Sequence, residues 1–274
     1  FGKLPAIGYD FEGAITLQPK GSEWSYTASV RYSRAQRGPK HSHDQSYKEL
    51  ANQLKYILTT YAFINTKDRT HTTHAIVDFS AGKDIGLGSF HGGKTTVHFG
   101  VRAAQLTEGA DGMLTAFSTK ANRNSANFTI HEADARMARS YTGIGPSASW
   151  DSATPFIGEL DDGLTFDWGA NAAVLFGRQK ASPVLRTKNT HVGAYGATSV
   201  LSHSTAAPLR DRTAIVPDVG GFAGFSWRLP NGKISLGYRA DFFFGAIDGG
   251  IATSQKEMRG FYGPFATVSL GIGG

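Results

Sequence analysis

The side chains best suited to metal chemistry are histidines that occur in close pairs. His41 and His43 are separated by one residue and His71 and His74 by two, so each pair could offer two imidazole nitrogens to a metal ion. The segment HEADA, which begins at His131, lacks the second histidine of the zinc-binding helix of metalloproteases. Histidines in solvated loops are the simpler interpretation, and we expect neither a metal nor another cofactor.

A second group of residues has the types that nucleophilic catalysis needs. His74, Asp78 and Ser80 have the same parity, which places them on one strand face, and His98 falls on the inward face of the next predicted strand. A serine hydrolase requires such groups to converge at one point, but polar barrel interiors contain many of them. The glycine-rich GLGSFHGG from Gly86 is not followed by the helix of a phosphate-binding loop and predicts a turn. We therefore expect no enzymatic activity.

The composition indicates that β-structure positions these residues. The chain has 274 residues, of which 40% are hydrophobic, with 34 glycines, 18 phenylalanines, 10 tyrosines and no cysteine. This usage favours strands, and it excludes disulfides and thiolate sites. No segment approaches the roughly 18 apolar residues of a membrane helix, so a membrane-spanning chain would need a barrel. The sequence begins at Phe1 without an initiator methionine, which leaves open a removed signal peptide or a start within a longer product.

Alternation of apolar and polar residues defines the expected strands. In KISLGYRADFFFGAI, one face carries Ile234, Leu236, Tyr238, Ala240, Phe242, Phe244 and Ala246, and the other carries Lys233, Ser235, Gly237, Arg239, Asp241 and Gly245. Nine segments alternate in this way: 9–18, 23–34, 75–82, 97–103, 139–151, 164–176, 215–228, 233–247 and 261–272.

The connections between these segments alternate in length. Short connections fall at 19–22, 84–93, 155–162 and 229–232, and long ones at 35–73, 108–135, 180–212 and 248–260. Short turns at one rim and long loops at the other are typical of an up-and-down outer-membrane barrel. Leu50, Leu54, Ile57 and Leu58 have helical spacing, which predicts a small helix or plug in the first long loop.

The number of strands needs a further assumption. Nine antiparallel strands would leave the first and last parallel, whereas bacterial single-chain barrels have even numbers. We predict about ten strands in one domain over residues 1–274, with eight or twelve as alternatives. The tenth strand would lie in 56–64 or upstream of Phe1.

Charged residues gather on the face opposite the apolar one. In a barrel in lipid, alternate residues contact hydrocarbon and the others line the lumen. We therefore predict these lumen-lining charges: Asp10, Glu12, Arg31, Asp78, Arg102, Arg139, Asp151, Asp167, Asp218, Arg228, Arg239 and Asp241. In a soluble barrel or sandwich the apolar face would instead be the core. Apolar bands of six or seven alternating positions favour the membrane form, since they suit the roughly 9 to 11 residues of a membrane strand.

Several stretches resemble a known class of proteins. They are EGAITLQPKGSEWSYTASVRYSRA from Glu12, IVDFSAGKDIGLG from Ile76, RSYTGIGPSASWDSATPF from Arg139, and GYRADFFFGAIDGG with the following RGFYGPFATVSLGIGG. Together they are similar to bacterial outer-membrane β-barrels of the Legionella-type major outer-membrane protein class, which form pores. The resemblance implies the outer membrane of a Gram-negative cell and brings no catalytic residues.

The expected function follows from the barrel and from this resemblance. Porin-like passive diffusion of small solutes is the leading expectation, and a closed barrel acting through its loops as a structural, adhesive or assembly protein is the alternative. About eight to ten strands leave room mainly for side chains, which favours the alternative. The formal charge of +6 suits anionic partners, and we expect outer-membrane lipid and lipopolysaccharide, bound by Arg34, Arg37 and Lys40, rather than nucleic acid. Self-association or contact with another envelope protein is also expected.

Overall fold

The computed structural model describes residues 7–44, 61–86, 93–118, 128–158, 160, 162–192, 198–205, 209–229, 232–249 and 254–270. These residues form ten strands: β1 Ile7–Leu17, β2 Trp24–Asp44, β3 Tyr61–Asp84, β4 Lys94–Ser118, β5 Phe128–Gly158, β6 Gly163–Val192, β7 Thr198–Thr205, β8 Arg210–Leu229, β9 Gly232–Asp248 and β10 Lys256–Leu270. Within these ranges, no helix has the length and apolar character needed to cross a membrane.

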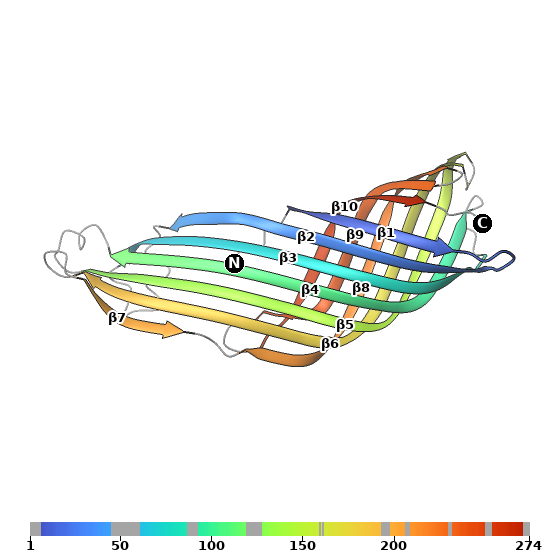
Figure 1. Ribbon diagram of the computed structural model, residues 1–274. Coiled ribbons are helices and arrows are strands. Elements are labelled where there is room, and N and C mark those ends of the chain that lie inside the picture. Colours follow the sequence, from blue (N-terminus) through green and yellow to red (C-terminus); the bar gives the residue numbers. More distant parts are fainter. Residues whose placement is uncertain are drawn as a thin grey trace.

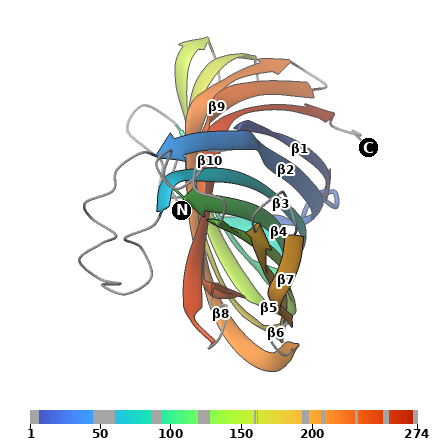
Figure 2. The ribbon, with the colours of Figure 1, turned by 90° about the vertical axis from the view of Figure 1, so that its left-hand side faces the viewer.

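All ten strands belong to one antiparallel sheet. Nine follow the order β1-β2-β3-β4-β5-β6-β8-β9-β10, and β7 pairs with the far end of β6. The sheet curls into a half-barrel in which β8, β9 and β10 return towards β1 (Figures 1 and 2). The predicted all-β, up-and-down barrel architecture with about ten strands is therefore confirmed. Because the nine-strand path alternates in direction, β1 and β10 run the same way.

The strands are much longer than the sequence pattern predicted. β3, β4, β5 and β6 contain 24, 25, 31 and 30 residues. Most of 35–73, 108–135 and 180–212, which we predicted as long loops, is therefore strand. The described part of 56–64 begins β3 at Tyr61, so the prediction of a separate tenth strand there was wrong, and the extra strand is β7. The helix predicted around Leu50–Leu58 lies outside the described residues.

A band of exposed apolar side chains covers the convex face near the short turns. Its members include Phe11, Tyr26, Phe99, Ile144, Trp150, Trp168, Phe176, Phe225, Trp227, Leu236 and Tyr262. Aromatic rings cluster at the short-turn rim, where Trp150 and Trp168 lie 6.1 Å apart and Phe166 and Phe225 lie 5.4 Å apart between ring centroids. On β2 the band runs from Trp24 to Tyr32, which matches the roughly 9 to 11 residues of a membrane-crossing strand.

The strand register fixes where this apolar band ends. Backbone pairing aligns Thr73, Thr107, Ser140 and Lys180 in one row across β3 to β6. From that row onward most of the described outward side chains are polar, with Met113 an exposed apolar exception, although the strands continue. We call this continuation the distal sheet; it comprises residues 34–44, 61–73, 107–118, 128–140, 180–192 and 198–205. Figure 1 shows it as the prolonged ends of β2 to β6, with β7 at its edge.

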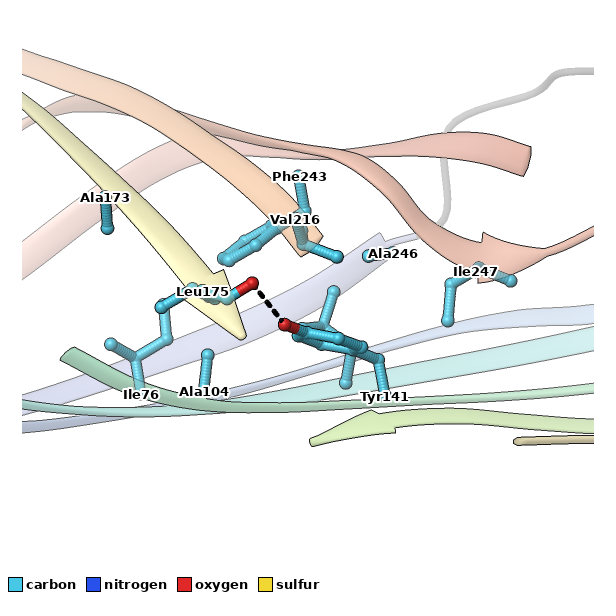
Figure 3. Close-up of a cluster of buried hydrophobic side chains, with 10 residues drawn as sticks. Ile76, Ala104, Tyr141, Ala173, Leu175, Val216, Phe243, Ala246 and Ile247 are labelled. Atoms are coloured by element: carbon cyan, nitrogen blue, oxygen red, sulfur yellow. Dashed lines mark hydrogen bonds between the residues drawn. The ribbon is translucent and has the colours of Figure 1, made fainter. Parts of the chain in front are cut away.

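The concave face carries a small apolar core. It consists of Ile76, Ala104, Leu106, Tyr141, Ala173, Leu175, Val216, Phe243, Ala246 and Ile247, contributed by β3, β4, β5, β6, β8 and β9 (Figure 3). The Tyr141 hydroxyl donates a hydrogen bond of 3.0 Å to the Leu175 carbonyl. These side chains extend into the interior from both walls.

A bulge in β9 brings two of these core residues into the interior. Gly245 has a φ of 71°, a conformation that glycine adopts without strain, and the pairing of β9 with β10 shifts beside it. The extra residues break the alternation, so that Ala246 and Ile247 are both buried. The prediction that Ala246 shares the outward apolar face with Phe244 was therefore wrong.

Candidate functional site in the barrel interior

Arg102 of β4 is the centre of the interior charge cluster. Its guanidinium donates to both carboxylate oxygens of Asp78 on β3, at 2.8 and 3.1 Å, and to the Asn171 side chain on β6, at 2.8 Å. It also donates to Asp218 on β8, whose side chain is fully buried. Since β4 and β8 are not neighbours in the sheet, the Arg102–Asp218 pair spans the interior. Bidentate pairing with an additional amide acceptor is the arrangement that offsets the desolvation of a buried arginine.

Ion pairs also bridge the seam between the two ends of the sheet. Arg31 of β2 lies 2.9 Å from the Asp241 carboxylate of β9, and both side chains are buried. Arg239 of β9 pairs with Glu12 of β1. Among the described residues no backbone hydrogen bond joins β1 to β10, so these side chains tie the barrel together at the seam.

Arg239 has a second set of partners in addition to its ion pair. Its guanidinium lies 5.6 Å from the ring centroid of Phe222 and 4.9 Å from that of Phe265. A guanidinium at these distances from aromatic rings is attracted to their faces. Arg239 is therefore held from three directions in the barrel interior.

Further carboxylates organise the two ends of the interior. At the short-turn end, Asp167 accepts hydrogen bonds from Thr165 and Ser226, each at 2.7 Å, and from Lys233 at 3.2 Å. At the distal end, Glu108 of β4 accepts two hydrogen bonds from Arg259 of β10, at 2.6 and 2.8 Å. This second pair again links strands that are not neighbours.

The His71 and His74 pair does not form the arrangement that its spacing allowed, and the side chains of His41 and His43 lie outside the described residues. His71 and His74 are three residues apart in β3, so they point to opposite faces, and His41 and His43 belong to the end of β2. His98 lies 3.3 Å from the Asp151 carboxylate. In the part of the chain that the structure describes, no group of three or more His, Cys, Asp or Glu side chains is arranged to hold a metal ion.

The buried His74 bonds to a serine other than the one its strand suggested. Its Nδ1 lies 2.7 Å from the Ser33 hydroxyl, and its ring packs edge-on against Phe261 with centroids 4.1 Å apart. Asp78 is bound by Arg102, and in the described part of the chain no hydrogen bond joins His74 to Asp78 or Ser80, the residues that share its strand face. Among the described residues, Nε2 of His74 has no hydrogen-bond partner, so none of them supplies the carboxylate that orients a catalytic histidine.

Two cavities flank the charged centre. The proximal cavity has a volume of about 460 Å³ and is lined by Ser29, Ser80, Ser149, Asp151 and Lys233, among others. The seam cavity has a volume of about 620 Å³, and its lining includes Asp10, Ser33, His74, Asp241 and Phe261. Arg239 and Phe265 contribute to the walls of both cavities. The stacked Arg239 side chain therefore stands between them.

We predicted twelve charged residues that line the lumen. Each of them either borders one of these two cavities or bonds to a partner on the concave face. Sequence reasoning missed Glu108, Arg259 and Asp248, because they lie in or beside segments assigned to loops. The parity of β4 could have revealed Glu108, since it continues the alternation from Arg102.

The residues predicted to contact lipopolysaccharide lie in a strand. We expected Arg34, Arg37 and Lys40 just beyond the second strand, but β2 extends to Asp44 and includes all three. The prediction of a loop there was wrong because pairing with β3 continues the strand. The Arg34 side chain is exposed, in the row where the convex face turns polar.

Comparisons of this chain with protein-family models, with curated proteins and with solved structures give no match.

Proposed function

We propose that this chain is a β-barrel of a bacterial outer membrane, in the class that its sequence resembles, with a closed lumen and a distal sheet projecting from the membrane. In this role it acts as a structural or adhesive surface protein, and we assign it no catalytic function. The observation that carries the proposal is the boundary on the convex face. The described outward side chains are mainly apolar up to the level of Tyr32 and mainly polar from the level of Arg34, with Met113 as an exception. A soluble sheet has no reason to change its outer surface abruptly at one level.

The closed lumen is supported by the contents of the interior. Ion pairs from Arg102 to Asp218 and from Glu108 to Arg259 cross it, and the apolar core around Tyr141 and Phe243 lies between these two levels along β4 and β5. A barrel of this strand number leaves room mainly for side chains. Transport would require several of these contacts to separate.

Passive diffusion of small solutes is the second candidate function. The observation that favours it is the position of Arg239, which borders both the proximal and the seam cavity. Movement of this one side chain away from Glu12 would join the two spaces. In this alternative the barrel is a gated pore rather than a closed wall.

Outer-membrane lipid and lipopolysaccharide are the partners that the convex surface suits best. Arg34, Arg178 and Lys180 are exposed and lie directly beyond the apolar band. Cationic side chains at this level would meet the phosphates of lipid headgroups, while the band contacts the hydrocarbon. Backbone pairing places two hydroxyl residues, Thr107 and Ser140, in the row that ends at Lys180.

Spin labels at single cysteines test the membrane placement, because the natural chain has none. Val174→Cys and Lys180→Cys are both outward on β6, inside and beyond the band, and Ala173→Cys is the inward control. In lipid vesicles, the label at Val174 should collide with oxygen but not with a water-soluble nickel chelate, and the label at Lys180 should show the reverse. Equal access of the chelate to both positions would exclude the proposed membrane band.

A further inference from the structure

The distal sheet has two free edges that differ in chemistry. β1 pairs with β2 only as far as Gln36, so the end of β2 lacks a second neighbour among the described residues. At the other side, β7 pairs with β6 over Arg186–Val192 and has no second partner in the described part of the chain. A free strand edge presents unpaired N–H and C=O groups that can pair with another strand.

The edge of β2 carries the features that prevent such pairing. The segment RGPK contains Arg37, Pro39 and Lys40, and the pairing with β3 shifts register between Arg37 and Lys40. Proline removes a backbone donor, and charged side chains must lose water when another strand approaches. This edge of the distal sheet is protected.

The edge of β7 lacks charge and proline altogether. Its sequence, TSVLSHST, contains no Asp, Glu, Lys, Arg, Pro or Gly over eight residues. It has one irregularity: Asn189 pairs with Ser202 and Thr190 with Val200, so Leu201 of β7 is an extra residue in the register with β6. The contrast with β2 therefore rests on charge and proline. Within one sheet, one edge is blocked and the other is suited to strand addition.

We propose that β7 pairs antiparallel with β7 of a second copy of this chain. The sequence is self-complementary at its ends: an antiparallel pair centred between Leu201 and Ser202 sets Thr198 opposite Thr205 and Ser199 opposite Ser204. Hydroxyl residues facing each other across strands are a favourable combination, and no like charges meet. Such a contact is isologous, so it closes as a dimer and does not propagate.

The antiparallel arrangement also sets the orientation of the two copies. β7 lies along β6, which runs from the barrel into the distal sheet (Figure 1). A two-fold axis perpendicular to these strands points the two barrels in opposite directions. If the barrels occupy membranes as proposed above, the paired copies belong to two facing membranes. Formation of the dimer in detergent does not depend on that placement, so the pairing and the membrane proposal fail separately.

Disulfide trapping with full-length protein in detergent tests the register. Directly opposite residues have Cα atoms about 4.5–5.5 Å apart, within disulfide range, whereas Thr198 of one copy is about 23 Å from Thr198 of the other. A mixture of the Thr198→Cys and Thr205→Cys variants should form a cross-linked dimer under mild oxidation, and neither variant should do so alone. Cross-linking of Thr198→Cys alone would indicate parallel pairing, and the absence of any cross-link would also overturn the proposal.

A charge exchange provides a test that does not need cross-linking. The Ser199→Lys/Ser204→Lys variant sets like charges opposite each other, and its dimerisation constant from analytical ultracentrifugation should fall about tenfold. The Ser199→Lys/Ser204→Asp variant should recover dimerisation, because each lysine then faces an aspartate. Ser42→Lys on the β2 edge is the matched control and should have no effect. Equal dimerisation by the two double variants, or weakening by the control alone, would contradict the proposal.

Discussion

The guanidinium of Arg31 in β2 lies 2.9 Å from the carboxylate of Asp241 in β9, although these strands lie near opposite ends of the sheet. The pair closes the seam where β1 and β10 share no backbone hydrogen bonds among the described residues. Both side chains are buried, with 8% and 3% of their surface exposed. The ends of the sheet are therefore joined by side-chain electrostatics.

Replacing only one residue of the Arg31–Asp241 pair should destabilise the barrel more than replacing both. Arg31→Met leaves Asp241 buried without its cation, which costs about 3–5 kcal/mol of unfolding free energy. The Arg31→Met/Asp241→Leu variant should recover most of this loss. Urea unfolding of the vesicle-bound protein, followed by tryptophan fluorescence, measures both changes.

The pair on the convex face between Arg178 and Asp211 is the matched control. It has a similar separation, 3.0 Å, but 70% and 30% of the two side chains are exposed. Arg178→Met should change the unfolding free energy by less than about 1 kcal/mol. Equal effects of Arg31→Met and Arg178→Met would mean that the seam pair does not hold the barrel together.

Gly143 should be necessary for the position of Tyr141 in the core. A methyl group at Gly143 would overlap the Tyr141 hydroxyl, because both residues face inward on β5. Gly143→Ala should therefore displace the ring, break its hydrogen bond to Leu175 and lower the unfolding free energy by about 1–3 kcal/mol.

Two further variants identify the cause of that loss. Gly13→Ala in β1 adds a methyl group with nothing within 4 Å and should change stability by no more than about 0.5 kcal/mol. In a Tyr141→Ala background, Gly143→Ala should cost much less than in the natural chain. Additive losses in the double variant would show that the glycine has another role.

Anionic lipid should bind along the boundary of the apolar band. Replacing Arg34, Arg178 and Lys180 together by glutamine removes three cationic side chains at headgroup level, each worth about 1 kcal/mol in attraction to anionic lipid. The amount of lipopolysaccharide retained after purification, measured by native mass spectrometry, should fall at least tenfold. Lys20→Gln, in the turn at the other rim, should retain it, and an unchanged amount in the triple variant would argue against this contact.

Period-two alternation accounts for much of what the sequence could predict. It predicted the strands of the barrel, the inward orientation of residues such as Arg102 and Asp218, and the parallel direction of the first and last strands. It did not reveal the distal sheet, because apolar and polar residues do not alternate regularly along those segments and pairing with neighbouring strands keeps them extended. The register between strands depends on the whole sheet rather than on any one segment.

Departures from alternation explain the remaining errors in the interior. Phe243 is inward by parity, but in a run of three phenylalanines hydrophobicity alone does not distinguish the faces. Ala246 was assigned outward because the two-residue period was continued through Gly245, where the bulge changes it. Ser33 and His74 lie opposite each other on the neighbouring strands β2 and β3, and this contact can be predicted only when the register of these strands is known.

Single-channel recording in a planar bilayer shows whether the lumen of the folded barrel is closed. The natural protein, with its fold verified in the same preparation, should give no steady current. The Arg239→Ala variant leaves the Arg102–Asp218 and Glu108–Arg259 pairs and the apolar core in place, so it should also give no steady current, whereas current steps from this variant would support the gated pore. Steady steps from the natural protein would contradict a closed lumen and would make solute diffusion the function to pursue.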